Sequence, residues 1–215
     1  VFAELQAGSN EVLFRVRNVV GEHCLYLHYR SLAGSVQPTL PEPLDAGGLA
    51  ARLKEAAKGG KQKVGAAFLD VDWVAEAARG DKVRGKKLFA ASGIGCAKCH
   101  AAKGLAAVPG APSLEGAGRR FTVPYLVESV LLPNRKISPV FRSSVIATTR
   151  GKVVTGLVVS ETGQVVTVLT PEAKRVEIPK GEIETRKTQN ISAMSGGLVK
   201  TPAELRDLIA YLLSQ

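Results

Sequence analysis

Residues 95–100 read GCAKCH and constrain this chain more than any other stretch, because they place two cysteines directly before a histidine with the spacing Cys-x-x-Cys-His. Two thiols spaced in this way can each add across a vinyl group of a haem, and the adjacent imidazole then falls beneath the iron as its proximal ligand. The motif therefore predicts one covalently attached c-type haem, held by Cys96 and Cys99, with His100 bound to the iron.

Other chemistry is open to the same residues. A structural zinc needs four nitrogen or sulfur ligands, yet the chain has no cysteine or histidine after residue 100, and only His23, Cys24 and His28 precede the motif. A redox dithiol of the thioredoxin type expects a βαβ setting, which the sequence pattern does not supply. Cys24 stands in an alternating stretch, where a small buried side chain is favoured over a reactive thiol. Zinc, a dithiol and coincidence remain the alternatives to haem.

Composition restricts the class of protein. The 215 residues are 45% hydrophobic and carry a net charge of +10. No apolar run reaches about 18 residues, so no transmembrane segment is expected. The cations are spread along the chain with few aromatic residues between them, which argues against nucleic acid and leaves a solvated surface or a docking face for an acidic redox partner. The start lacks a leader pattern and a methionine, so we expect a processed or excised piece of something longer.

Three segments differ in their pattern. Residues 1–30 alternate like strands and are weakly similar to the last hairpin of a galactose-binding-like β-sandwich, here incomplete. Residues 31–79 begin rich in proline, glycine and serine, and we expect a linker with one short helix over 47–60. Residues 80–215 are predicted to form a domain of helices with an antiparallel β-sheet of four or five strands inserted at 143–187.

Helix ends in the third segment carry clear signals. Asp81 and Thr122 are expected to cap helices that begin just after them. The last stretch, TPAELRDLIAYLLSQ, has Thr201 as N-cap, Pro202 at the first helical position and Glu204 three residues after the cap, which is a capping box. Its leucines and isoleucine recur with helical spacing and predict one apolar face.

Residues 80–215 resemble a class I-like c-type cytochrome, in particular the haem-binding domain at the C-terminus of planctomycete and verrucomicrobial dehydrogenase-like proteins. The stretches that carry the resemblance are RGKKLF…GCAKCH, VESVLLPNRKISPVF, GKVVTGLVVSETGQVVTVLT and LVKTPAELRDLIAYLLS. The resemblance implies a mainly α cytochrome c fold with the β-sheet as an insertion. It also implies that the first helix of this domain crosses the last one, with Gly85 and Phe89 against Leu208 and Tyr211.

The resemblance assigns a second axial ligand as well. Met194 is the only methionine, and it lies in a Ser/Gly-rich loop where such cytochromes place their distal methionine. Core packing is the ordinary role of a lone methionine. If Met194 did not bind the iron, a histidine from residues 1–30 or a lysine would be the second axial ligand, or that position would stay open.

Residues near the motif receive roles by the same resemblance. His100 should donate its Nδ1–H to a backbone carbonyl, and Pro112 matches the proline that supplies it, although Ala-Pro stands where the family has Gly-Pro and Pro109 is an alternative. Leu114 would then line the haem. Arg119 or Arg120 could contact a propionate, or both could be solvated; we select Arg120.

These residues predict an electron carrier rather than an enzyme. A haem with His100 and Met194 as axial ligands would cycle between two iron states, with a periplasmic or exported dehydrogenase as donor and another cytochrome or an oxidase as acceptor. One alternative is a haem enzyme or gas sensor with an open or exchangeable distal site. A third hypothesis is a carbohydrate-binding module, suggested by residues 1–30, that anchors the redox domain.

Overall fold

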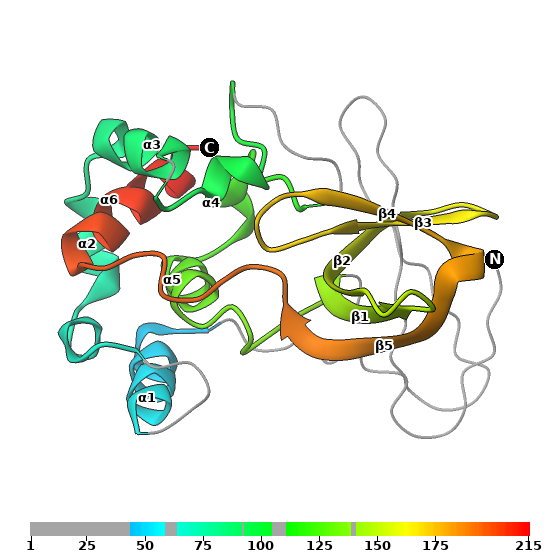
Figure 1. Cartoon of the computed structure of the whole chain (residues 1–215). Helices are drawn as coiled ribbons and strands as arrows, with labels where there is room; N and C mark the ends of the chain where they lie inside the picture. The colour runs from blue at the N-terminus through cyan, green and yellow to red at the C-terminus, as the bar shows by residue number, and fades with distance from the viewer. Residues whose placement is uncertain (1–43, 59–63, 92, 105–110, 139–140) are drawn as a thin grey trace, which may run out of the picture. The chain divides into compact units, whose positions relative to one another are not determined.

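The computed structural model describes residues 44–58, 64–91, 93–104, 111–138 and 141–215. Residues 42–215 form one compact unit. The hairpin expected over 1–30, with His23, Cys24 and His28, lies outside the described residues. Figure 1 labels the elements.

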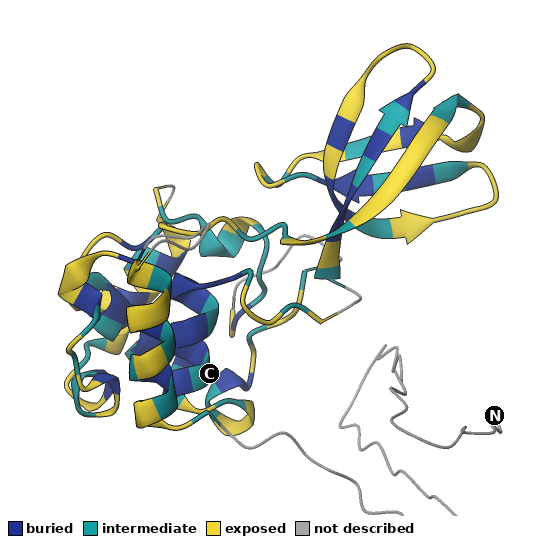
Figure 2. Ribbon diagram, turned by 90° about the horizontal axis from the view of Figure 1, so that it is seen from below, coloured by how far each residue is buried: buried dark blue, intermediate teal, exposed yellow. Residues whose placement is uncertain are grey.

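Five of the six described α-helices, all except α4, supply the first hydrophobic core, and Figure 2 shows the buried faces of the helices. Its fully buried side chains include Leu53, Phe89, Val127 and Leu205. The helices are α1 (Ala46–Ala57), α2 (Trp73–Ala78), α3 (Lys82–Ala90), α4 (Ala117–Arg120), α5 (Val123–Leu131) and α6 (Pro202–Leu213), with the 3-10 turns η1 (Ala66–Phe68) and η2 (Cys96–Lys98) between them.

The predicted helix starts are confirmed. The Asp81 carboxylate accepts hydrogen bonds from the backbone N–H groups of residues 83 and 84, and the Thr122 hydroxyl accepts one from residue 125. Thr201 and Glu204 form the reciprocal pair of a capping box at the start of α6. Each cap satisfies backbone donors that have no partner within the helix.

α3 crosses α6 in close contact. A Cβ added at Gly85 would overlap the carbonyl oxygen of Asp207, so only glycine permits this approach. The rings of Phe89 and Tyr211 lie 5.4 Å apart at the same crossing. The expected contact between the first and last helices of the 80–215 segment is thus confirmed.

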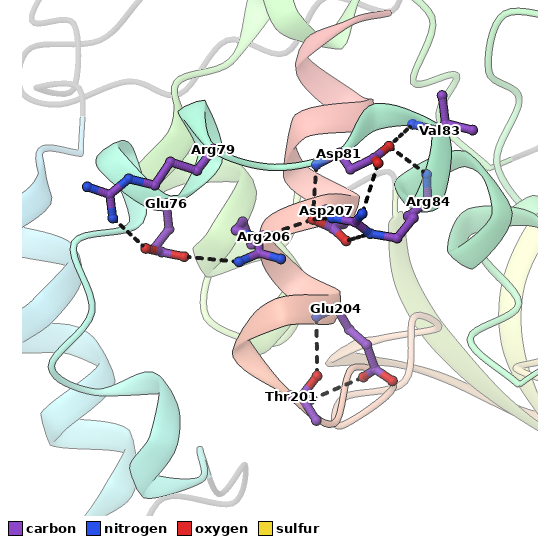
Figure 3. A network of polar contacts seen from close by, with 9 residues as sticks. All are labelled: Glu76, Arg79, Asp81, Val83, Arg84, Thr201, Glu204, Arg206 and Asp207. Atoms are coloured by element: carbon purple, nitrogen blue, oxygen red, sulfur yellow. Dashed lines mark hydrogen bonds and ion pairs between the residues drawn. The ribbon is translucent and has the colours of Figure 1, made fainter.

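A network of hydrogen bonds and ion pairs around Asp207 also joins α3 to α6 (Figure 3). The Asp207 carboxylate accepts hydrogen bonds from the Asp81 backbone N–H at 3.0 Å, from Arg84 Nε at 2.6 Å and from Arg206 Nε at 3.1 Å. Its side chain is only 6% exposed. Burial by itself would raise the pKa of Asp207, but these donors outweigh it and lower the pKa to about 2.

Five antiparallel strands form a sheet in the order β4-β3-β2-β1-β5. They are β1 (Arg142–Thr148), β2 (Val153–Glu161), β3 (Val165–Leu169), β4 (Arg175–Pro179) and β5 (Ile183–Ser192). The predicted antiparallel sheet is therefore present, and the expected turn sequences connect β1 to β2, β2 to β3 and β3 to β4. The sheet has a hydrophobic core of its own, made by Ile146, Val154, Val166, Val168 and Ile178.

The long strand β2 pairs with a different strand along each of its halves. Its first half, as far as Gly156, pairs with β1, and its second half, from Leu157, pairs with β3. A Cβ at Gly156 would overlap the carbonyl oxygen of Leu169 on β3, so glycine allows the backbones to approach where β2 changes partner. This arrangement lets the strands enclose a core without help from a helix.

The expected fold class, a mainly α cytochrome c fold with an inserted sheet, is wrong. Of the described residues, 39% are helical and 23% lie in the five-stranded sheet, so the unit is mixed α and β. The physical reason is that the sheet buries its apolar side chains in a second hydrophobic core of its own and does not merely cover the helical core. The resemblance to c-type cytochromes therefore overestimated the helical share of this unit.

The segment expected to be a linker contributes to the helical core where it is described. Leu49 and Leu53 of α1, Phe68 of η1 and Trp73 of α2 are all buried there. Nη1 of Arg52, on α1, donates to both carboxylate oxygens of buried Glu128, on α5, at 2.8 and 2.9 Å. From residue 42 onward the chain belongs to the compact unit. Among the helices described, none has the length and apolar character needed to cross a membrane.

Candidate functional site

The GCAKCH motif, residues 95–100, folds as one tight turn a few residues after α3 ends at Ala90. Gly95 has φ 69°, a left-handed conformation that favours glycine. The backbone N–H groups of Cys99 and His100 both donate to the carbonyl of Cys96, at 3.1 and 2.9 Å. The 3-10 turn η2 thereby fixes the spacing of the two thiols and the imidazole.

The two thiols are free and neutral. Burial raises the pKa of Cys96 to about 11, and burial also raises the pKa of Cys99, where Lys98 partly opposes the change. A dithiol that reacts as a thiolate needs a lowered pKa, so the thioredoxin alternative loses support. Among the described residues, no three histidine, cysteine, aspartate or glutamate side chains lie together as possible ligands of a metal ion.

His100 is held in one orientation. Its Nδ1 lies 2.8 Å from the carbonyl oxygen of Pro112, and because a carbonyl can only accept, Nδ1 carries the proton. Burial lowers the pKa of His100, although the same hydrogen bond opposes the change, so the ring is neutral with the Nε2 lone pair unused by that bond. The expected carbonyl partner is therefore present at Pro112, and the alternative, Pro109, lies outside the described residues.

The segment that carries Pro112 is held from two sides. The Leu114 N–H donates to the carbonyl of Ala101 at 2.8 Å, which ties the segment to the residue after His100. On the other side, Nη2 of Arg120 donates to the carbonyls of Ser113 at 2.8 Å and Glu115 at 2.9 Å. The sequence predicts that Arg120 contacts a haem propionate, and nothing in it indicates these hydrogen bonds to backbone carbonyls.

Cys96, Leu114 and Met194 all pack against the helical core as partly buried side chains. Met194 lies in the loop between β5 and α6, and its backbone N–H donates to the Ser192 hydroxyl at 3.0 Å. The structure thus brings these three predicted residues to one hydrophobic cluster. The role of Met194 as an iron ligand stays a prediction.

Two further residues near the site, Gln215 and Gly118, are not among the predicted site residues. The Gln215 side chain, beyond the end of α6, accepts a hydrogen bond from the Lys103 N–H at 2.8 Å. A Cβ added at Gly118 of α4 would overlap the carbonyl oxygen of Leu213. The C-terminal end of α6 therefore contacts both the residues after the motif and the helix that carries Arg120. A glycine in the sequence GAGRR was the one available hint of a close approach.

The donor set fits a covalently attached haem. Two neutral thiols flank one turn, and the following imidazole keeps Nε2 available for iron because Nδ1 is already hydrogen-bonded. Comparison with models of known protein families gave no match, and comparison with curated proteins gave none either. The functional interpretation therefore depends on the motif and its geometry.

Proposed function

We propose that this chain binds one c-type haem covalently and transfers single electrons. The observation that carries the proposal is the hydrogen bond from His100 Nδ1 to the Pro112 carbonyl, next to the two free thiols of Cys96 and Cys99. This bond selects the tautomer and ring orientation that an iron-binding imidazole requires. Attachment adds the S–H of each cysteine across a vinyl group of the haem, so it requires both thiols to be reduced and free of a disulfide.

Haem, when bound, supplies the iron couple that accepts and releases one electron. In this proposal Cys96 and Cys99 would hold the haem covalently, and the His100 imidazole and the Met194 thioether would bind its iron. A thioether as axial ligand raises the reduction potential. Leu114 contributes apolar surface that keeps water away from the ring edge.

The proposed partners are redox proteins. Residues 82–120 include eight lysines and arginines and a single glutamate, so the segment around the motif has a clear excess of positive over negative charge. A charge distribution of this kind attracts an acidic surface and speeds association at low ionic strength. We propose a periplasmic or exported setting, with a dehydrogenase as donor and another cytochrome or an oxidase as acceptor.

Haem attachment is the direct test. The chain is expressed with a system that attaches c-type haem, then denatured, and the haem that stays with the polypeptide is measured by absorbance and mass. The parent is expected to retain one haem, and Cys96→Ser combined with Cys99→Ser to retain none. Cys24→Ser is the matched control, because it removes a thiol outside the motif. Haem that is missing from the parent, or that survives the double substitution, would refute the proposal.

The distal ligand separates the electron carrier from the alternative, a haem enzyme or gas sensor. Oxidised parent protein is expected to show the weak long-wavelength absorption band of a thioether–iron bond, and Met194→Ala is expected to lose it. The reduced parent should not bind carbon monoxide readily, whereas Met194→Ala should. Carbon monoxide binding by the reduced parent itself would favour the enzyme or sensor hypothesis.

A further inference from the structure

We propose that Arg120 is a positioning residue that keeps His100 in the Nδ1–H tautomer by holding the backbone on which the Pro112 carbonyl lies. The identity of the group at Nε2 rests on the proposed function. The tautomer is a property of the chain alone, so the two ideas can fail separately.

Arg120 holds the backbone just after the carbonyl that His100 needs. One nitrogen, Nη2, uses its two hydrogens to bind the carbonyls of Ser113 and Glu115, which lie one and three residues after Pro112 in the chain. A guanidinium stays charged at every relevant pH and presents these donors in a fixed plane. Hydrogen bonds from a charged donor are stronger than those from a neutral one. Arg120 is thereby suited to fix the 113–115 backbone.

The base of Arg120 is itself anchored. α4, which ends at Arg120, can lie against the C-terminal end of α6 because Gly118 has no side chain to collide with Leu213. The Arg120 guanidinium also lies 4.9 Å from the centre of the Phe121 ring, which limits where the side chain can swing. The position of α6 is therefore transmitted through α4 to the 113–115 backbone.

On the opposite side of the segment the ties are both at Leu114: its N–H donates to the carbonyl of Ala101, and its side chain packs against the helical core. Without Arg120, Leu114 would act as a pivot, and the Pro112 carbonyl could turn away from His100. A free neutral imidazole favours the Nε2–H tautomer, which cannot offer Nε2 to a metal. Loss of Arg120 should therefore be read out at the histidine ring, twenty residues away in sequence.

The positioning role of Arg120 does not require that its side chain also contact a haem propionate. Nε and Nη1 of Arg120 are not used in the two backbone hydrogen bonds, so the side chain can hold the segment whether or not it also meets an anion. A contact with an anion would change a loaded protein only. The tautomer effect should appear in the protein without haem.

The experiment uses ¹⁵N-labelled chain produced without haem and records long-range proton–nitrogen correlations of its histidines at alkaline pH. The signals of His23 and His28 are identified by their replacement with glutamine. We expect the parent to hold His100 as Nδ1–H, and Arg120→Leu to lower the ratio of Nδ1–H to Nε2–H about tenfold. Arg119→Leu, which removes the same charge from the same helix, should leave the ratio unchanged.

Arg120→Lys keeps the charge without the planar donors and should give an intermediate ratio. Equal ratios in the parent and Arg120→Leu, or an equal shift in Arg119→Leu, would overturn the positioning role. In haem-loaded protein, Arg120→Leu should also shift the reduction potential more than Arg119→Leu does. A tautomer shift in a chain that never attaches haem would retain the positioning role and reject the proposed function.

Discussion

Replacing Gly85 by alanine is expected to lower the free energy of unfolding by about 3 kcal/mol, because the new methyl group would overlap backbone atoms of α6. The collision is with the carbonyl of Asp207, which cannot move without disturbing the helix. α3 and α6 would have to separate, and the contact between Phe89 and Tyr211 would weaken with them. Urea denaturation followed by circular dichroism measures the change as a lower midpoint.

Gly47→Ala provides the matched control. Gly47 is an exposed glycine inside α1, and a Cβ there would come no closer than 3.7 Å to a neighbouring atom. Alanine should stabilise this helix by up to about 1 kcal/mol. The same substitution is thus expected to have opposite signs at two helical positions. If Gly85→Ala proved neutral, the close crossing of α3 and α6 would be incorrect.

Removing the Asp207 carboxylate is expected to cost about 3 kcal/mol, because the buried side chain receives donors from Asp81, Arg84 and Arg206 that would lose their acceptor. Arg84 is partly exposed, so water can solvate its freed charge and keep the cost at the lower end of the range for buried pairs. Thermal or urea unfolding of Asp207→Ala measures it. Asp70→Ala is the control, since the pair of Lys54 and Asp70 is exposed and should contribute less than about 1 kcal/mol.

The same carboxylate predicts a pH dependence. The pKa of Asp207 falls from the usual 3.8 to about 2 in the folded protein, so the stabilisation it gives is complete above pH 3.8 and disappears as the pH falls toward 2. Its size is on the order of 2 kcal/mol. The difference in stability between parent and Asp207→Ala should therefore shrink across this window. A difference that stays constant with pH would show that the carboxylate is not held in its charged form by these donors.

Local signals in the sequence predicted local structure well. Asp81, Thr122 and Thr201 cap helices as expected, because a side-chain oxygen before a helix acts within three residues and needs no tertiary partner. The turn sequences between the first four strands succeeded for the same reason. The hydrogen bond of His100 to Pro112 was reached through a family resemblance rather than through a physical derivation.

Long-range packing was where prediction failed. The sequence predicts the sheet as an insertion in a mainly helical domain, because nothing in an alternating pattern reveals whether the apolar face of a strand meets a helix or another strand. The short helix expected over 47–60 is present as α1, but the sequence assigned it, with Leu49 and Leu53, and Trp73 after it to a linker, because proline and glycine dominate the residues before them. The backbone contacts of Arg120 could not be predicted, because an arginine next to a glycine-rich loop has many possible acceptors.

The pairing of β1 with β5 has a consequence for how the chain folds. The last turn of α5 and the first turn of α6 are separated by some seventy residues, and closing so long a loop to bring the helices together costs entropy. Arg142 at the start of the sheet lies opposite Ser192 at its end, and Asn134, just after α5, accepts a hydrogen bond from the Ser192 N–H. Once the sheet has formed from its short hairpins, only residues 132–141 and 193–201 remain to be closed. Forming the sheet first therefore lowers the entropic cost of bringing α5 and α6 together by roughly 1 kcal/mol. It favours an order in which the strands pair before α6 packs against the other helices.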